Sequence, residues 1–176
     1  MSITPLFFPD VKLIEPKVYS DARGFFKELQ NQQFFSDVGI DCTFVQMNHS
    51  FSSYGVLRGM HFQRSLPQAK HLIVLSGEIY DVVVDIRPDS PTFKQWLGIH
   101  LKADLHQQLF IPAGFAHGFC VLSPTVHLIY QCSALFNLAE DRVFCYNDPE
   151  IGIVWPIDEP LLSEKDRLAP RFKDVN

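Results

Sequence analysis

Apolar residues along this chain recur mostly at every second position and rarely with the 3.6-residue spacing of an amphipathic helix. The segment 126–132, Val-His-Leu-Ile-Tyr-Gln-Cys, alternates around a strongly apolar stripe. Such alternation is typical of strands that bury one face. The same reasoning predicts further strands at 24–29, 43–48, 56–63, 71–75, 78–86, 96–101, 109–111 and 118–122.

Turn-forming residues separate these strands, notably at 87–91 (Arg-Pro-Asp-Ser-Pro) and 112–114 (Pro-Ala-Gly). Ser76-Gly77, between two apolar runs, predicts a hairpin. Helical signals are few: 31–37 predicts one or two turns, and Ser163 resembles an N-cap followed by a short helix. Many short strands at close spacing favour a β-sandwich or barrel.

The 176 residues suit one domain, 1–176, because there is no internal repeat, linker or low-complexity segment. We expect the part from Asn147 onward, which is richer in proline and charge, to wrap the barrel. The hydrophobic fraction of 47% excludes a disordered chain. No apolar run is long enough to span a membrane, and the N-terminus lacks the pattern of a signal peptide.

The net charge limits the classes of binding partner, and the cysteine spacing indicates the cellular compartment. The net charge is −5 and there is no basic block, so a nucleic-acid duplex is excluded as a partner, whereas a small anion remains possible where a few cations converge. The four cysteines form no Cys-x-x-Cys pair, which predicts reduced thiols in a cytoplasmic protein.

The segment 57–63, Leu-Arg-Gly-Met-His-Phe-Gln, places Arg58 and His61 in an otherwise apolar strand. Both are costly to bury without partners, so we expect them to line a cleft where the histidine can move protons near neutral pH. Strict alternation would put them on opposite faces, and Gly59 is the natural site for a bulge that brings them together. The alternative is a core histidine bonded to a backbone carbonyl, which the nearby arginine disfavours.

Other polar residues could complete such a site, and each also has a structural interpretation. Lys70 could stabilise a developing oxyanion or lie in solvent at a strand end. Tyr130 could donate a proton or be a core residue with a satisfied hydroxyl. His117 is as consistent with a structural role as with a functional one, and Arg23 could be a turn residue or a phosphate contact.

No metal or cofactor signature is present. Cupin-type metal sites usually carry His-x-His, but here His61 is followed by Gln63, and no cysteine–histidine spacing fits zinc. Gly-x-Gly-x-x-Gly, P-loop and Gly-x-Ser-x-Gly patterns are also missing. A metal-dependent cupin oxygenase or isomerase is therefore disfavoured, and we predict no cofactor.

Several segments form a specific set along nearly the whole chain, namely 23–26 (Arg-Gly-Phe-Phe), 44–50, 56–63, 77–87, 90–93, 111–119 and 147–153. In this order they resemble one family, the dTDP-4-dehydrorhamnose 3,5-epimerases. The resemblance implies an all-β fold, a cupin-like jelly-roll β-barrel with short peripheral helices, that pairs into a homodimer. It also implies an isomerase of dTDP-rhamnose biosynthesis, serving lipopolysaccharide or capsule.

The resemblance also implies a site and a reaction. The catalytic residues would be His61 as general base, Asp166 orienting it, Tyr130 as proton donor on the opposite sugar face and Lys70 near the ketone oxygen. The reaction would invert carbons 3 and 5 of dTDP-4-dehydro-6-deoxyglucose, without cofactor or metal, to give dTDP-4-dehydrorhamnose. The residues implied to contact this nucleotide-sugar substrate are Arg23, Glu28, Gln46, Asn48, Arg58, His117, Asp141 and Lys165.

The chain departs from the family in the pocket wall. A common Tyr-Lys-x-Thr-x-Tyr-Tyr run is replaced at 130–136, where Gln131, Leu135 and Phe136 stand for the lysine and the two tyrosines. A common Lys-Leu-Val-Arg run is Lys-His-Leu-Ile at 70–73, and Asp141 replaces a glutamate. Three alternatives therefore stay open: a single-centre epimerase, an epimerase of another nucleotide-linked 4-keto sugar, and a non-catalytic sugar-binding jelly roll.

Overall fold

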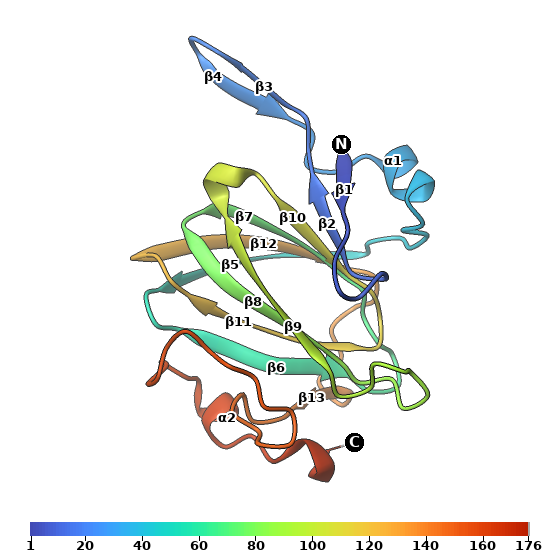
Figure 1. Ribbon diagram of the computed structural model, residues 1–176, viewed down its shortest axis with the longest axis vertical. Coiled ribbons are helices and arrows are strands. Elements are labelled where there is room, and N and C mark those ends of the chain that lie inside the picture. The colour runs from blue at the N-terminus through green and yellow to red at the C-terminus, as the bar shows by residue number, and fades with distance from the viewer. Residues whose placement is uncertain (176) are drawn as a thin grey trace.

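The computed structural model describes residues 1–175, and two antiparallel sheets face each other to form a barrel (Figure 1). This arrangement confirms the predicted all-β jelly-roll barrel. The six-stranded sheet runs β1 (Ser2–Thr4), β2 (Lys12–Glu15), β10 (Gln108–Ile111), β7 (Lys70–Ser76), β12 (Thr125–Cys132), β5 (Gln46–Ser53). The five-stranded sheet runs β13 (Asp141–Val143), β6 (Leu57–Gln63), β11 (Phe115–Val121), β8 (Glu78–Asp85), β9 (Trp96–Lys102).

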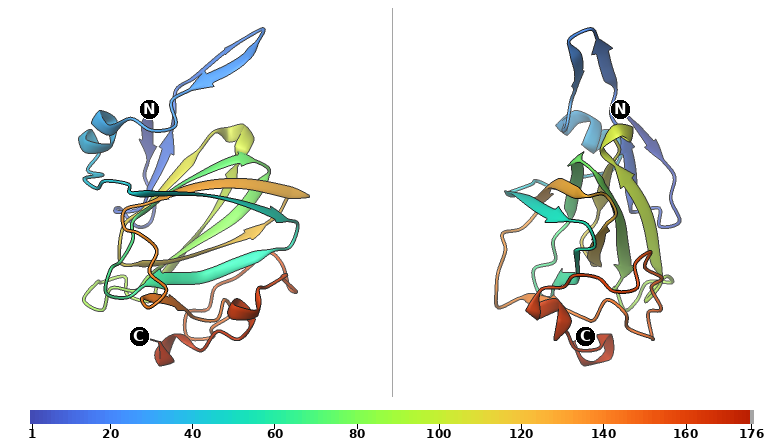
Figure 2. Two further views of the ribbon diagram at one scale, coloured as in Figure 1. Left: turned by 180° about the vertical axis from the view of Figure 1, so that it is seen from behind. Right: turned by 90° about the vertical axis from the view of Figure 1, so that its left-hand side faces the viewer.

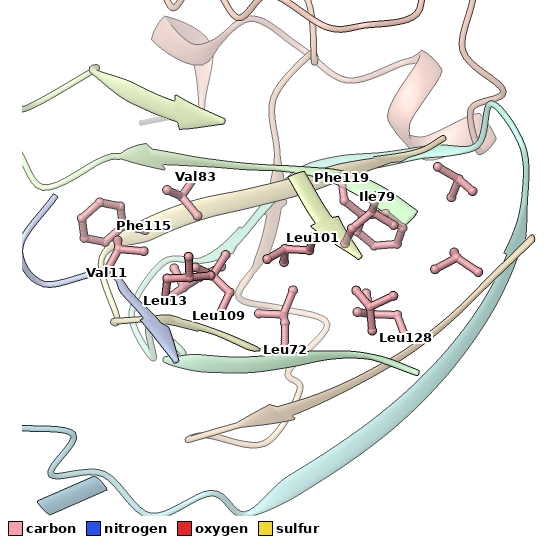
Figure 3. Packing of buried hydrophobic residues seen from close by; sticks show 14 of the residues in the cluster. Val11, Leu13, Leu72, Ile79, Val83, Leu101, Leu109, Phe115, Phe119 and Leu128 are labelled. Carbon is pink, nitrogen blue, oxygen red and sulfur yellow. The ribbon is translucent and has the colours of Figure 1, made fainter. Parts of the chain in front are cut away.

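The main core lies between the two sheets, as the period-two pattern predicts. Leu72 and Leu128 of the six-stranded sheet belong to the same buried cluster as Ile79 and Phe119 of the five-stranded sheet (Figure 3). All four are at most 4% exposed. Burying such side chains removes apolar surface from water and is the main force that holds the sheets together.

Short helical segments and the C-terminal part cover the outer faces of the sheets. Phe35 of α1 (Gln32–Asp37), which Asn31 caps, packs in a cluster with Ile14 and Phe110 of the six-stranded sheet. Phe172, in the 3₁₀ turn η2 (Phe172–Asp174), packs with residues of the five-stranded sheet. Both predicted helices are confirmed, since α2 (Glu164–Arg167) begins after its N-cap Ser163, and the C-terminal part wraps the barrel as predicted (Figure 1).

The predicted hairpin at Ser76-Gly77 is wrong. Strand β7 pairs with β10 and β12, whereas β8 pairs with β9 and β11, so the chain crosses here from one sheet to the other. Gly77 has φ +84°, and a Cβ at this position would lie 2.2 Å from the carbonyl oxygen of Thr125. Glycine is needed at this corner because no side chain fits, and local sequence alone does not distinguish a corner from a hairpin.

The other differences concern short or exposed strands. Strand β5 spans 46–53 rather than 43–48, and β1, β2, β13 and β3 (Val18–Asp21) were not predicted. Strand β3 pairs with β4 (Gly24–Lys27) in a hairpin that projects away from the barrel (Figure 2). A remaining 3₁₀ turn, η1, spans Ala103–Leu105. Among residues 1–175, no helix is long and apolar enough to cross a membrane.

Candidate active site

A cavity of about 470 Å³ opens between the two sheets, and most of the predicted site residues line it. They come from β5, β6, β7, β11, β12, β13 and the segment around α2. Residues distant in sequence therefore meet at one site because the strands that carry them are neighbours in the barrel. The predicted residues in its lining are Gln46, Asn48, Arg58, His61, Lys70, His117, Tyr130, Asp141, Lys165 and Asp166.

His61 and Asp166 form a hydrogen-bonded pair, with 2.7 Å between His61 Nε2 and Asp166 Oδ1. Burial alone would raise the pKa of Asp166, but the hydrogen bond and charge of His61 bring it below its ordinary value, so the group is a carboxylate. A carboxylate only accepts hydrogen bonds, so the imidazole proton lies on Nε2 and the lone pair on Nδ1. The arrangement leaves Nδ1 of His61, whose side chain is 31% exposed, as an available base.

Two contacts surround this pair. The backbone N–H of Asp166 donates to Ser163 Oγ, the N-cap of α2, which fixes the start of the short helix. Asp141 Oδ1 lies 4.0 Å from Nδ1 of His61, and Asp141 also pairs with Lys165. A positive charge that forms on His61 during a reaction would thus lie between the carboxylates of Asp166 and Asp141.

The strand carrying His61 is irregular where the sequence predicted a bulge. The pairing of β6 with β11 shifts register between His117 and Phe119, opposite Gly59, whose φ is +142°. A Cβ on Gly59 would lie 2.6 Å from the Cα of Gly118, so the two backbones approach more closely than a side chain permits. The irregularity brings Arg58 and His61 to the same cavity, and the prediction is confirmed.

Lys70 and Tyr130 line the cavity from the six-stranded sheet, opposite the sheet that carries His61. Burial lowers the pKa of Lys70, and the nearby Cys132, Asp81 and Asp141 partly oppose this effect. Burial also raises the pKa of Tyr130, so its hydroxyl keeps its proton well above neutral pH. The cavity therefore combines a base, a cation and a protonated phenol, which suits proton removal next to a carbonyl group.

His117 has a carboxylate partner that the sequence analysis missed. Its Nε2 lies 2.8 Å from Oδ2 of Asp81, a fully buried side chain on β8. Burial lowers the pKa of His117 more than Asp81 raises it, so the imidazole is neutral at pH 7. An aspartate inside the apolar run 78–86 was the available signal, since a buried carboxylate requires a partner.

Arg23 and Glu28 lie apart from the cavity of their own chain. Arg23, on the turn of the projecting β3–β4 hairpin, has a side chain that is 90% exposed and pairs with Asp21 at 2.6 Å. Glu28, just after β4, is exposed and accepts a hydrogen bond from Asn31. Neither is among the residues that line the cavity of the same chain.

Several lining residues were not predicted as site residues, and no metal cluster accompanies them. Cys132 and Ser50 share strand faces with predicted residues, so strand periodicity could have identified them. Gln63, Gln68 and Phe136 also line the cavity. Within residues 1–175, no group of three or more histidine, cysteine, aspartate or glutamate side chains could hold a metal ion.

Comparison with known proteins agrees with this geometry. The sequence model of the dTDP-4-dehydrorhamnose 3,5-epimerase family matches residues 5–174. An enzyme of that name from Pseudomonas aeruginosa is 48% identical, with 100% of this chain and 98% of that protein aligned. One from Neisseria gonorrhoeae is 49% identical over 94% of this chain, which spans only 51% of that longer protein.

Solved structures show the same fold with related ligands. A dTDP-6-deoxy-D-glucose-3,5-epimerase from Legionella pneumophila, in complex with dTDP-4-keto-L-rhamnose, superimposes with a TM-score of 0.96 at 42% identity, covering 99% of this chain and 94% of that one. A 3'-monoepimerase from Streptomyces bikiniensis, in complex with dTDP-quinovose, gives 0.87 at 36% identity, covering 95% and 86%. Because the family model matches nearly the whole length of this chain, the chain belongs to the dTDP-4-dehydrorhamnose 3,5-epimerase family.

Proposed function

We propose that this protein is a cofactor-independent epimerase that inverts carbons 3 and 5 of dTDP-4-dehydro-6-deoxyglucose to give dTDP-4-dehydrorhamnose. The observation that carries the proposal is the His61–Asp166 pair. His61 lies on one sheet, and Lys70 and Tyr130 lie across the same cavity on the opposite sheet. A hydrogen next to a ketone is acidic only when the resulting charge spreads onto the carbonyl oxygen. The reaction therefore needs a base on one sugar face, a cation at the oxygen and a proton donor on the other face.

In the proposed mechanism His61 Nδ1 takes the proton from the carbon next to the ketone, and Asp166 stabilises the imidazolium. The electron pair moves onto the ketone oxygen, where Lys70 stabilises the negative charge. The ketone re-forms as Tyr130 gives its hydroxyl proton to the opposite face of the same carbon. Tyr130 then regains a proton from solvent and His61 releases its extra proton to solvent, so both groups return to their starting states. Arg58 and Lys165 supply positive charge for the diphosphate in an otherwise acidic protein.

Incubation with the keto-sugar nucleotide in deuterium oxide tests this function directly. We expect NMR to show deuterium at carbons 3 and 5 and inversion at both, because each inverted centre receives its new hydrogen from solvent. Binding of the nucleotide sugar without any exchange would instead identify a non-catalytic sugar-binding jelly roll.

Tyr130→Phe tests the assignment of the proton donor. We expect the variant to keep exchanging substrate hydrogen with deuterium, because His61 can return a proton to the face it came from. Net inversion should fall much further than exchange, by about 10²-fold or more. Normal inversion in the variant would show that Tyr130 is a packing residue and that another group is the donor.

A second candidate function is inversion at one centre only. The departures at Leu135 and Phe136 favour it, since Phe136 lines the cavity and the 3'-monoepimerase of known structure has the same fold. The same NMR experiment distinguishes the two functions by the number of carbons that gain deuterium and invert.

We further propose that the protein acts as a cytoplasmic homodimer in which each β3–β4 hairpin reaches the cavity of the second copy. The hairpin exposes Tyr19, Phe25 and Phe26, each more than half exposed, which is a large apolar area for an isolated surface. Arg23 could then contact the nucleotide sugar bound by the partner. Mixing Arg23→Ala with His61→Asn protomers should restore about a quarter of the activity if such dimers exchange subunits at random, whereas a hairpin that does not reach the second copy would leave Arg23→Ala active by itself.

A further inference from the structure

Three glutamine side chains on the cavity wall hold one loop by its backbone. The loop, residues 133–140, connects β12 to β13 and carries Phe136 to the mouth of the cavity. Four successive residues of this loop are each bonded to a glutamine amide. The bonds are Gln68 Nε2 to Ala134 O (2.7 Å), Gln63 Nε2 to Leu135 O (3.3 Å), Phe136 N to Gln46 Oε1 (2.8 Å) and Asn137 N to Gln63 Oε1 (2.7 Å).

Burial of apolar side chains does not hold this loop in place. Leu135 is 65% exposed, Phe136 is 55% exposed and Leu138 is 77% exposed. The hydrophobic effect, which fixes most of the barrel, therefore contributes little to the position of these residues. The hydrogen bonds from the glutamines are the main restraints on the stretch 134–137.

Gln63 is the central member of the three. Its side-chain amide also donates to the carbonyl oxygen of Leu66 at 2.9 Å, so it joins the loop 64–69 to the loop 133–140. The residue is 5% exposed, and both amide donors and the oxygen are in use. It stands two positions after His61 on β6, where a His-x-His metal motif would place its second histidine. In this protein the position holds an amide instead, and its nitrogen and oxygen are bonded to the backbone of the two loops.

We propose that Gln63, assisted by Gln68, is a positioning residue for ligand binding, because it fixes Phe136 as a rigid wall of the cavity mouth. A wall that is already ordered spares the ligand the entropic cost of ordering it. The identity of the ligand, a nucleotide sugar, rests on the proposed function. The anchoring of the loop depends only on the contacts described above.

We expect a variant that lacks the Gln63 amide to bind the ligand more weakly but to convert the bound substrate at nearly the same rate. Replacing Gln63 with methionine keeps the side-chain length but removes three hydrogen bonds. We expect KM for the keto-sugar nucleotide and Kd for dTDP to rise by about ten- to a hundredfold, because small displacements of binding groups have large effects. The value of kcat at saturation should stay within about threefold, since the base, the cation and the proton donor remain in place.

A graded set of variants tests the proposal. Gln63→Met should have the largest effect, Gln68→Met, which removes one bond, a smaller effect in the same direction, and Gln33→Met none. Gln33 is an exposed residue of α1 whose amide bonds only Asp37, which makes it a matched control. The measurements are steady-state kinetics, calorimetry with dTDP, and amide hydrogen exchange of residues 134–137.

The outcomes separate this proposal from the proposed function. Unchanged KM and dTDP affinity in Gln63→Met, or faster exchange at 134–137 with unchanged affinity, would overturn it, as would a fall in kcat with KM fixed. If Gln63→Met does not fold, Gln68→Met decides by the same criteria. If the wild-type protein lacks epimerase activity, the proposed function fails, while calorimetry and amide exchange still test the role of Gln63.

Discussion

Two histidine–aspartate pairs each contribute their histidine to the lining of the same cavity, and they differ in what a ligand can reach. His61 bonds Asp166 at 2.7 Å and His117 bonds Asp81 at 2.8 Å, and the two histidines are direct partners across β6 and β11. The side chain of His61 is 31% exposed, whereas that of His117 is 10% exposed. Similar hydrogen bonds therefore give an accessible base in one pair and a fixed, neutral imidazole in the other, because burial differs.

The origin of the two carboxylates differs as well. Asp81 belongs to β8, a strand in the middle of the five-stranded sheet, so its position is set by the barrel itself. Asp166 belongs to α2, in the C-terminal segment that wraps the barrel (Figure 1). The base is thus oriented by a segment outside the two sheets, while the neutral histidine is oriented from within them.

Replacing each histidine by asparagine should give the largest contrast. We expect His61→Asn to lower kcat by about 10²–10⁴-fold or more, because it removes the proposed general base. His117→Asn should cost less, since a neutral imidazole can be partly replaced by an amide as a hydrogen-bonding group. Rates within about tenfold of wild type for His61→Asn, with the fold intact by circular dichroism, would contradict the assignment.

Replacing either aspartate by asparagine should affect catalysis, but the two variants should differ in which kinetic property changes. Asp166→Asn should lower kcat by about 10–100-fold, because the amide no longer stabilises the protonated imidazole or fixes its tautomer. Asp81→Asn should mainly shift the pH profile, since Asp81 raises the pKa of Lys70 and its loss lowers that pKa further. Equal losses of kcat with unchanged profiles in both variants would remove the distinction drawn between the pairs.

The alkaline limb of the pH profile should report on Lys70, which lies near both pairs. In the proposed mechanism its charged form stabilises the oxyanion, and burial lowers its pKa, so activity should fall as pH rises at values below the ordinary lysine pKa of about 10.4. Tyr130, whose pKa burial raises, stays protonated over this range. In Lys70→Arg the guanidinium stays charged, so any residual activity should not fall over this alkaline range. If the activity of this variant falls at the same pH as that of the wild type, a group other than Lys70 causes the fall.

Removal of metal should have the smallest effect. We expect prolonged chelation followed by desalting to leave the rate unchanged, because the proposed reaction uses only side chains for acid–base chemistry. A matched sample without chelator provides the reference. A loss of activity that one divalent cation restores would show that a histidine of either pair serves as a ligand instead.

Much of the fold could be predicted because its signals are local. The strands β6, β7, β8, β9 and β12 are seven or eight residues long and rich in apolar residues, and their predicted bounds agree with the structure within one residue. The strands β1, β2 and β3 are three or four residues long, too short for a period to be recognised. The corner at Gly77 was mistaken for a hairpin because pairing between sheets is a property of the whole barrel.

The candidate site was likewise only partly predictable from the sequence. A polar residue in an apolar strand identified His61, and the resemblance to the family supplied Tyr130, Lys70 and Asp166, which line the same cavity. The local pattern marks Asp81 as a buried carboxylate that needs a partner, but it does not identify His117, which lies 36 positions away, as that partner. The roles of Gln46, Gln63 and Gln68 in holding a loop are also invisible in sequence, since an amide bonded to a distant backbone carries no periodic signal.

The sequence by itself determined the all-β class, most of the long strands, the helix cap at Ser163 and the family, because apolar patterning, capping and motif order are written along the chain. Only the tertiary structure decided which histidine is accessible, which carboxylate each one meets, and that Arg23 and Glu28 lie away from their own cavity. These properties depend on burial and on distances between strands far apart in sequence. Both are set by how the two sheets close around the core rather than by neighbouring residues.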